Sequence, residues 1–217
     1  IGMDGDVLCF SFDGIKNITS GEGGAVVTAD AKVAQRVKDA RLLAVERDTE
    51  KRYQGQRSWT FEVHHQGYRY HMSNLMAAIG REQLKKLGQF SRHRKQCVAR
   101  YLAELDGFAG LSMLELDYGS IVPHIFPLRV DGGARDALVE HLREAGIESG
   151  VHYMPNHLLD YFATEYRLPV AERLGAELIS LPLHAELSVP EQDRVIAAVR
   201  AFLCKGHVCI SERPCRT

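Results

Sequence analysis

The N-terminal part of the chain contains two short apolar runs, followed by a segment whose apolar residues recur at the spacing of a helix. Residues 7–12 form an apolar run of β-prone side chains and residues 25–28 form a second one, so both are predicted to be strands. Asp30 is a favourable N-cap residue, and the apolar positions after it predict an amphipathic helix over 31–44. The polar and irregular stretch 45–62 predicts a long loop.

The rest of the chain carries longer amphipathic patterns, which predict helices between short strands. Two helices, 74–87 and 90–105, are predicted on either side of Gly88. Prolines in the apolar segment 121–130 favour an edge strand or a bulge there. The other predicted elements are a helix at 135–145, a strand at 147–153, and helices at 170–178 and 190–203, the last with a capping box formed by Ser188 and Glu191. This alternation predicts a small α/β domain.

Composition and charge narrow the possible function classes. The chain has 217 residues, a formal net charge of -1, 45% hydrophobic residues and 25% charged residues, which is ordinary for a globular protein. A charge near zero gives no general reason to expect binding to nucleic acid or to membranes. No apolar run approaches the roughly 20 residues that span a bilayer. Five irregularly spaced cysteines do not resemble a disulfide framework, so a reducing, cytoplasmic location is expected.

The stretch between the two N-terminal strands has the composition of a ligand-binding loop. It contains a single lysine, Lys16, together with Asn17, hydroxyl-bearing residues and four glycines. Such a loop at the end of a strand suits a phosphorylated ligand that also carries a carbonyl group. Its backbone N–H groups and hydroxyls can bind the phosphate, and its amine can capture the carbonyl group. A glycine-rich hairpin with a solvated lysine is the alternative, and the residue types alone do not exclude it.

The order of residues in this loop, SFDGIKNITSGEGG over 11–24, resembles the lysine segment of the DegT/DnrJ/EryC1/StrS family of sugar-nucleotide aminotransferases. The resemblance implies an α/β chain with the PLP-dependent transferase fold type I, the aspartate aminotransferase-like fold (PLP is pyridoxal 5'-phosphate). It implies that Lys16 binds PLP covalently and that Ser11 contacts the cofactor phosphate, with help from Asn17. Many members have His where this chain has Asp13, so the resemblance assigns no role to that position.

Two further segments resemble signatures of the same family. GYRYHMSNLMAAIG, over 67–80, resembles the loop that reaches across the family's dimer to the partner's cofactor phosphate, and Arg69 occupies the phosphate-binding position. A guanidinium suits a phosphate because it donates two parallel hydrogen bonds, although a surface salt bridge is an alternative role for Arg69. GVHYMPNH, over 150–157, resembles the segment at the mouth of the substrate site. The residues implied to bind substrate there are His152, Tyr153 and His157.

A metal site is not expected, although several histidines lie close together in the sequence. His64 and His65 point in different directions in any regular element, and no cysteine lies nearby to complete a zinc site.

The signatures together imply a PLP-dependent aminotransferase. It would transfer an amino group, typically from glutamate, to a nucleotide-linked keto-sugar such as a 4-keto-6-deoxy sugar. A homodimer is implied, because Arg69 would act on a second subunit. Residues 1–88 would form the C-terminal part of the large PLP-binding domain and 89–204 the small C-terminal α/β domain, whereas the tail 205–217 lies outside the family pattern.

The resemblance covers only the C-terminal half of a typical family member, so the chain is expected to be a fragment. The other half would supply the aromatic residue that stacks on the pyridine ring and the Asp that pairs with its nitrogen. Two alternatives are therefore a non-catalytic remnant and one half of a split enzyme that needs its N-terminal partner. Some members are dehydratases with His in place of the lysine, and Lys16 argues against that activity.

Overall fold

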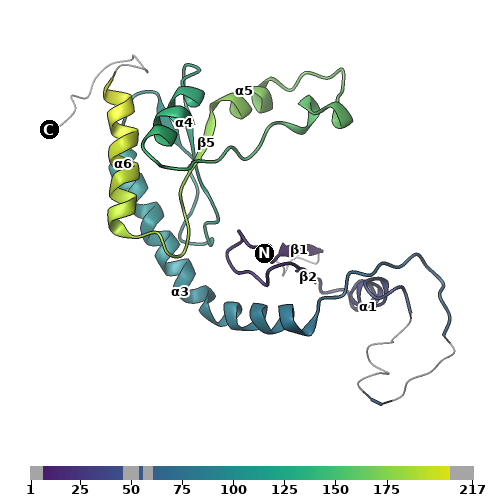
Figure 1. The fold of residues 1–217 in the computed structure, drawn as a ribbon. Helices are drawn as coiled ribbons and strands as arrows, with labels where there is room; N and C mark the ends of the chain where they lie inside the picture. Colours follow the sequence, from purple (N-terminus) through teal and green to yellow (C-terminus); the bar gives the residue numbers. More distant parts are fainter. Residues whose placement is uncertain (1–6, 46–53, 56–60, 206–217) are drawn as a thin grey trace. The chain divides into compact units, whose positions relative to one another are not determined.

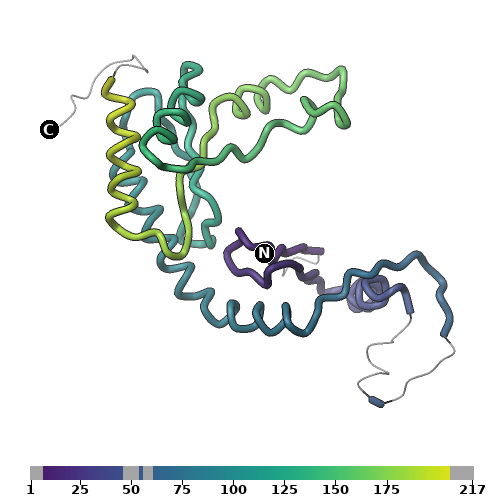
Figure 2. Tube along the Cα trace, viewed as in Figure 1, coloured from purple at the N-terminus to yellow at the C-terminus, as the bar shows by residue number. Residues whose placement is uncertain are grey.

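The computed structural model describes residues 7–45, 54–55 and 61–205 (Figures 1 and 2). The chain divides into two compact units, Ile1–Leu87 and Gly88–Thr217. Most of the predicted loop 45–62, and all but the first residue of the tail 205–217, lie outside the described residues.

The first unit begins with the antiparallel hairpin that the two apolar runs predicted. Strand β1 (Leu8–Ser11) pairs with strand β2 (Gly24–Val27), and the register places Ser11 opposite Gly24. The backbone continues to pair beyond the strands, because the Phe12 amide donates to the Gly23 carbonyl at 2.9 Å. Backbone hydrogen bonds therefore close the loop between Ser11 and Gly24.

Helix α1 (Ala31–Ala40) begins where the sequence predicted and ends earlier. The Asp30 carboxylate accepts hydrogen bonds from the amides of Lys32 at 2.7 Å and Val33 at 3.3 Å, which satisfies two free N–H groups of the first turn. The expected end at residue 44 is wrong. Leu43 and Ala44 adopt left-handed conformations with φ of 62° and 57°, which a right-handed helix does not accommodate.

Helix α3 (Asn74–Leu105) is one continuous helix and crosses the boundary between the two units. The Ser73 hydroxyl accepts a hydrogen bond from the Met76 amide at 3.2 Å and so begins the helix. The predicted break at Gly88 is wrong. A glycine inside a helix costs only about 1 kcal/mol relative to alanine, and helical residues on both sides outweigh that cost.

The second unit is built on a three-stranded antiparallel sheet. Its strands are β3 (Leu111–Met113), β4 (Phe126–Val130) and β5 (Leu178–Leu181), in the order β3-β4-β5. Its other elements are α4 (Arg135–Glu144), the short 3-10 helices η1 (Asn156–Leu158) and η2 (Asp160–Phe162), α5 (Pro169–Glu177) and α6 (Val189–Cys204). The predicted capping box of α6 is confirmed, since Ser188 and Glu191 bond reciprocally.

Two strand predictions in the second unit differ from the structure, the first in extent and position and the second entirely. The segment 121–130 forms a strand only over β4, and β4 is central rather than an edge strand. Pro127 is tolerated there because β3 pairs only with residues 128–130, so its missing N–H faces no β3 residue. The segment 147–153 forms no strand and makes a single bridge, in which Gly150 and Ser180 exchange backbone hydrogen bonds of 3.0 Å and 2.7 Å.

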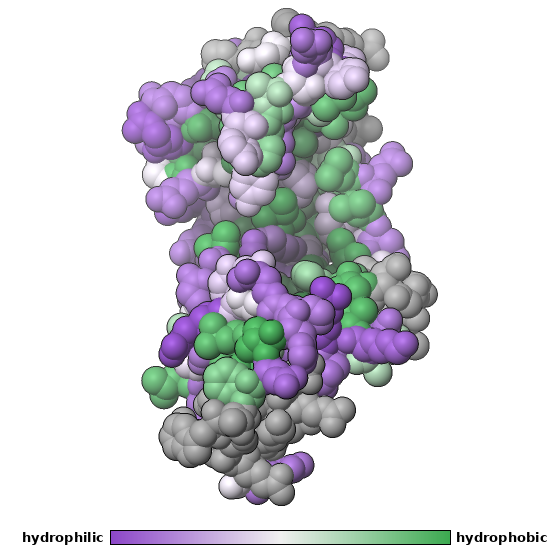
Figure 3. All heavy atoms as spheres, turned by 90° about the vertical axis from the view of Figure 1, so that its right-hand side faces the viewer, coloured by the Kyte–Doolittle hydropathy of each residue, from purple (hydrophilic) through white to green (hydrophobic). Residues whose placement is uncertain are grey.

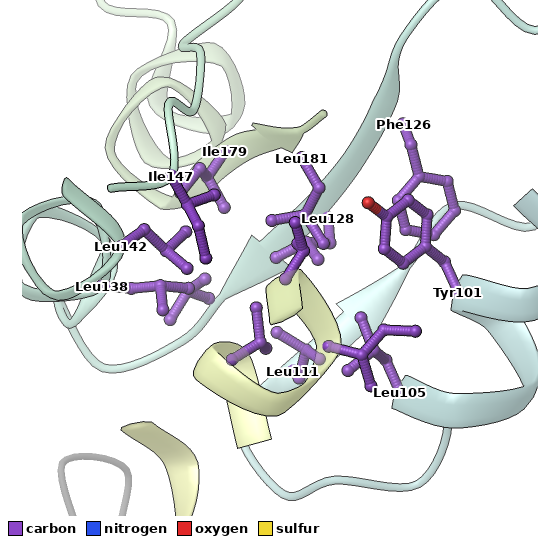
Figure 4. Packing of buried hydrophobic residues seen from close by; sticks show 14 of the residues in the cluster. Tyr101, Leu105, Leu111, Phe126, Leu128, Leu138, Leu142, Ile147, Ile179 and Leu181 are labelled. Carbon is purple, nitrogen blue, oxygen red and sulfur yellow. The ribbon is translucent and has the colours of Figure 1, made fainter. Parts of the chain in front are cut away.

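The hydrophobic core belongs to the second unit. Figure 4 shows Tyr101 beside Phe126, and Leu138 and Leu142 of α4 close to Ile179 of β5. The side chains of this core with no exposed surface are those of Val98, Tyr101, Leu105, Phe126, Leu128, Val130, Leu138, Leu142 and Val199. Such burial contributes about 1.5–3 kcal/mol for each large side chain. In the described part of the first unit, by contrast, only Ser20 and Ala44 are buried.

Within the described residues, no helix is both long and apolar enough to cross a membrane. The same residues contain no group of three His, Cys, Asp or Glu side chains arranged to hold a metal ion. Cys9 is exposed and Cys97 is buried, and both are free thiols.

Candidate active site

The loop between β1 and β2 folds into a tight turn that carries Lys16. The Asp13 carboxylate accepts a hydrogen bond from the Ile15 amide at 3.0 Å, and the Asp13 carbonyl accepts one from the Lys16 amide at 3.0 Å. The Ser11 hydroxyl oxygen accepts from the Asp13 amide at 3.3 Å. Asp13 thus shapes the turn through its own side chain, as Asp commonly does, and Ser11 and Lys16 are held in the same turn.

A second set of hydrogen bonds fixes the return path of the loop. The Thr19 hydroxyl donates to the Phe12 carbonyl at 3.1 Å and accepts from the Gly21 amide at 2.9 Å. Ser20, which is 1% exposed, donates from its hydroxyl to the Glu22 carbonyl at 2.7 Å. A glycine is needed at position 24, since a Cβ there would lie 2.5 Å from the Phe10 carbonyl oxygen. The loop is therefore organised by its own backbone and hydroxyl groups.

The Lys16 side chain takes no part in this organisation. It is partly buried, and among the described residues its ammonium group has no hydrogen-bond or ion-pair partner. The Ser11 hydroxyl accepts one bond and keeps its own proton to donate, and Asn17 lies next along the chain, also partly buried. An amine and a hydroxyl proton in the same loop fit PLP, which carries an aldehyde for the amine and a phosphate for the hydroxyl donor.

Arg69 lies on a short segment that is bound to the end of α1. Tyr68 donates its amide to the Ala40 carbonyl at 2.7 Å, and Tyr70 donates to the Arg41 carbonyl at 2.9 Å. The rings of Tyr68 and Tyr70 stack at 5.1 Å with an angle of 6° between their planes. The Arg69 side chain is exposed and forms no ion pair with any residue that the structure describes, nor a hydrogen bond with the Lys16 turn.

Gly67 permits the close approach that positions this segment. A Cβ at Gly67 would lie 2.2 Å from both the Ala44 nitrogen and the Leu43 carbonyl carbon, which are backbone atoms that cannot yield locally. We expect Gly67→Ala to separate the segment from α1 at a cost of about 1–3 kcal/mol, the usual cost of overpacking. Amide hydrogen exchange would report the separation, because the Leu43 amide, which donates to the Tyr68 carbonyl at 3.0 Å, should lose protection.

The matched control for this variant is Gly14→Ala. An added Cβ at Gly14 meets no atom within 4 Å, so exchange at Leu43 should not change. Full protection of the Leu43 and Tyr68 amides in Gly67→Ala would contradict the proposed clash.

The three residues expected to bind substrate lie in the second unit, on the segment between β4 and α5. The His152 ring bonds through Nδ1 to the Ser180 hydroxyl at 3.0 Å and meets the Tyr153 ring edge-on at 4.8 Å. Tyr153 is 69% exposed. His157 bonds through Nε2 to the Glu172 carboxylate at 3.3 Å. The two histidines are thus anchored, and Tyr153 is free to contact a ligand.

This segment extends away from the sheet of the second unit (Figure 1). Several of its apolar side chains are exposed. On the face of the molecule drawn in Figure 3, hydrophobic areas in green lie among hydrophilic ones in purple. The exposed apolar residues between 153 and 170 are Tyr153, Met154, Leu158, Leu159, Tyr161, Phe162, Tyr166, Leu168 and Val170. Clustered exposure of this kind is typical of surfaces that bind ligands or partners.

Sequence reasoning missed Glu172 and Arg167. The Arg167 guanidinium donates to both Glu172 carboxylate oxygens, at 3.0 Å and 2.5 Å, and the Leu168 amide donates to the same group at 3.1 Å. These donors, Arg167 first, lower the pKa of Glu172 from 4.5 to about 2. The signal available in the sequence was Pro169 at the start of a helix with an acidic residue in its first turn, which marks a helix N-terminus but not a site.

The structure therefore groups the candidate residues into two sets. Ser11, Lys16 and Asn17 share one loop of the first unit, and Arg69 lies on a separate segment of the same unit. The other set, His152, Tyr153 and His157, lies in the second unit.

Comparison with known proteins relates both sets to one family. A family model described as the DegT/DnrJ/EryC1/StrS aminotransferase family matches residues 1–200. The spore coat polysaccharide biosynthesis protein SpsC of Bacillus subtilis is 32% identical over 211 residues, which are 92% of this chain and 54% of SpsC.

Two crystal structures are similar to the chain. The aminotransferase TlmJ from Streptoalloteichus hindustanus matches with a TM-score of 0.83 and 33% identity, over 94% of this chain and 54% of TlmJ. The sugar aminotransferase CalS13 from Micromonospora echinospora matches with a TM-score of 0.82 and 26% identity, over 93% of this chain and 53% of CalS13. The chain thus spans about half the length of the relatives that it matches.

Proposed function

We propose, because the chain belongs to the DegT/DnrJ/EryC1/StrS aminotransferase family, that it acts in the transfer of an amino group from glutamate to a nucleotide-linked keto-sugar. Aminotransferases of this family use PLP, and the chain has the α/β architecture of PLP-dependent transferases of fold type I. The single observation that carries the proposal is the Lys16 turn, which presents a partly buried amine without a partner among the described residues.

Lys16 would have two roles. Its Nζ atom would bind the cofactor aldehyde until the amino donor displaces it, and the free amine would then take a proton from one carbon and return it to another. PLP supplies the electron-withdrawing ring that makes this proton removable. The rigid turn around Asp13 would keep Nζ in reach of the reacting atoms throughout, because the hydrogen bonds that hold the turn do not involve the Lys16 side chain.

The remaining candidate residues would bind and orient. Ser11 would donate its hydroxyl proton to the cofactor phosphate, Asn17 would assist it, and Arg69 of a second subunit would supply a guanidinium. His152, Tyr153 and His157 would contact the substrate. This assignment would make the active protein a homodimer, because Arg69 would act on a second subunit, and a cytoplasmic location is proposed with it.

The substrate is proposed to be a nucleotide-linked 4-keto-6-deoxy sugar. Support comes from the relatives, one of which is named for spore coat polysaccharide biosynthesis and another as a sugar aminotransferase. By analogy the product would be an amino sugar for a cell-surface polysaccharide or a related deoxysugar compound.

The second candidate is a non-catalytic protein, or one half of a split enzyme that needs its N-terminal partner. The observation behind it is that the chain spans about half the length of the relatives it matches. The two candidates differ in what they require for cofactor binding, so one assay separates them.

That assay measures amino transfer with and without the co-expressed N-terminal half of SpsC. The purified preparation is incubated with PLP, glutamate and a thymidine-diphosphate-linked 4-keto-6-deoxy sugar, and 2-oxoglutarate is measured. Formation of 2-oxoglutarate that depends on the sugar supports the aminotransferase in whichever preparation it occurs. Its absence from both preparations would favour the non-catalytic candidate.

Arg69 offers a separate test of the phosphate site. We expect Arg69→Ala to weaken PLP binding by about 1.5–3 kcal/mol, because it removes one charged hydrogen bond to the phosphate. The dissociation constant would be measured by fluorescence titration of the preparation that binds PLP. Arg81→Ala, which removes another exposed arginine of the first unit, is the matched control. Equal PLP affinity in the two variants would remove Arg69 from the site.

A further inference from the structure

Helix α5 forms a platform for the segment that carries His157. Pro155 packs on Gly175 so closely that a Cβ on the glycine would lie 2.6 Å from Pro155 Cδ. His157 contacts Glu172, which lies three residues before Gly175 and so on the same face of the helix. Two contacts on successive turns therefore fix both the backbone at Pro155 and the ring at His157.

The contact between His157 and Glu172 is largely shielded from solvent, and it includes a charged carboxylate. The two side chains are only 9% and 19% exposed, and Nε2 lies 3.3 Å from the carboxylate. A glutamate is ionised at neutral pH at its ordinary pKa, and the Arg167 guanidinium lowers the pKa of Glu172 further, to about 2, so this carboxylate can only accept hydrogen bonds. The proton of a neutral His157 imidazole must then be on Nε2, which leaves Nδ1 as an acceptor.

Nδ1 of His157 is the unused atom of this arrangement. It has no hydrogen-bond partner within the part of the chain that the structure describes. Arg167, whose side chain is 82% exposed, bonds to Glu172 and not to His157. A fixed acceptor of this kind pairs with a donor that a ligand brings, and hydroxyl groups are the abundant neutral donors of sugars.

We propose that Glu172, held by Arg167, is a positioning residue that keeps His157 in the Nε2–H tautomer, so that Nδ1 accepts a hydrogen bond from a hydroxyl group of the sugar substrate. The inference rests on the proposed function, because that function brings a sugar to His157. It extends that function by assigning one substrate contact to one ring nitrogen and by adding two residues that touch neither cofactor nor substrate.

The first test is spectroscopic and needs no substrate. Histidine N–H protons usually exchange with water too fast to be seen, whereas a shielded and bonded one gives a signal. In the ¹⁵N-labelled full chain at neutral pH, we expect an Nε2–H signal for His157 in the wild type and in the control Glu165→Gln. Glu172→Ala should lose that signal. Arg167→Gln, which changes an exposed side chain and leaves the fold intact, should accelerate its exchange at least about tenfold.

Two results of this test would overturn the proposal. One is an Nδ1–H tautomer for His157 in the wild type. The other is an Nε2–H signal in Arg167→Gln that exchanges with water as slowly as in the wild type. This second result can be interpreted even if Glu172→Ala fails to fold.

The second test uses the preparation that transfers amino groups. With a thymidine-diphosphate-linked 4-keto-6-deoxy sugar, Arg167→Gln should raise KM for the sugar about tenfold, the loss expected for one hydrogen bond, and leave the half-reaction with glutamate unchanged. An unchanged KM would overturn the hydroxyl contact. If the wild type transfers no amino group, the proposed function fails, and the spectroscopic test still decides whether Glu172 positions His157.

Discussion

Under the proposed function, replacing Lys16 with alanine should abolish covalent binding of PLP and lower the rate of amino transfer by about a hundredfold to ten-thousandfold. Both effects follow from the loss of one amine, which would serve as the attachment point and as the acid and base for proton transfer. No other lysine lies between β1 and β2, so no neighbour can substitute. Borohydride reduction followed by peptide mass spectrometry measures the attachment, and 2-oxoglutarate formation measures the rate.

The Lys16→Ala variant should fold like the wild type, which makes the result interpretable. The turn is held by the Asp13 carboxylate and by backbone groups, and the Lys16 side chain contributes no hydrogen bond to it among the described residues. Circular dichroism and the urea midpoint should therefore be unchanged. Lys38→Ala, which removes an exposed lysine of α1, is the control and should keep full attachment.

Trapped PLP on another lysine of the Lys16→Ala variant would contradict the assignment. So would equal trapping in the wild type and the variant. Attachment to Lys16 without amino transfer would leave the binding role intact and remove the proton-transfer role.

The turn that carries Lys16 was predictable because the hydrogen bonds that hold it are local. Ser11, Asp13, Lys16 and Thr19 lie within one loop, and their hydrogen bonds join residues two to seven positions apart. Short-range bonds of this kind depend on residue order, which a sequence displays directly. The strands on either side were predictable for the same reason, since their pairing needs only a turn between them.

The sequence did not predict where α1 ends or that β4 is the central strand of its sheet. Both features depend on contacts with residues that are distant in the sequence. Residues 41–44 have helical spacing, but Leu43 donates its amide to Tyr68 and turns away. Pro127 suggested an edge strand, and only the short length of β3 shows why a proline fits at the centre. Tertiary pairing outweighs local preference in both cases.

The contact between His157 and Glu172 also needed the structure. They lie fifteen positions apart, and neither the histidine nor the glutamate indicates its partner by spacing. The resemblance named His157 as a substrate residue, but only the geometry indicates which of its nitrogens faces the protein. Sequence therefore identifies the candidate residue, and structure identifies the atom.

The largest stability effect is expected for Phe126→Ala in the second unit, with a loss of about 3–5 kcal/mol in the free energy of unfolding. Phe126 has no exposed surface, lies on the central strand β4, and stacks on Tyr101 with ring centroids 4.9 Å apart. Its removal would leave a cavity beside Tyr101, whose hydroxyl is fixed by a 3.0 Å hydrogen bond to the Pro182 carbonyl and so resists collapse. Urea denaturation measures the loss as a lower midpoint with an unchanged slope.

Phe162→Ala is the matched control, since Phe162 is 55% exposed in η2 and its loss should change stability by less than about 0.5 kcal/mol. A similar midpoint for the two variants would contradict the core assignment.

Loss of Phe126 should also loosen the segment that carries His152. Strand β4 pairs with β5, and Ser180 of β5 bonds to both Gly150 and His152. A partly unfolded sheet would therefore release His152, and Phe126→Ala should raise hydrogen exchange at the Gly150 amide, whereas Phe162→Ala should not.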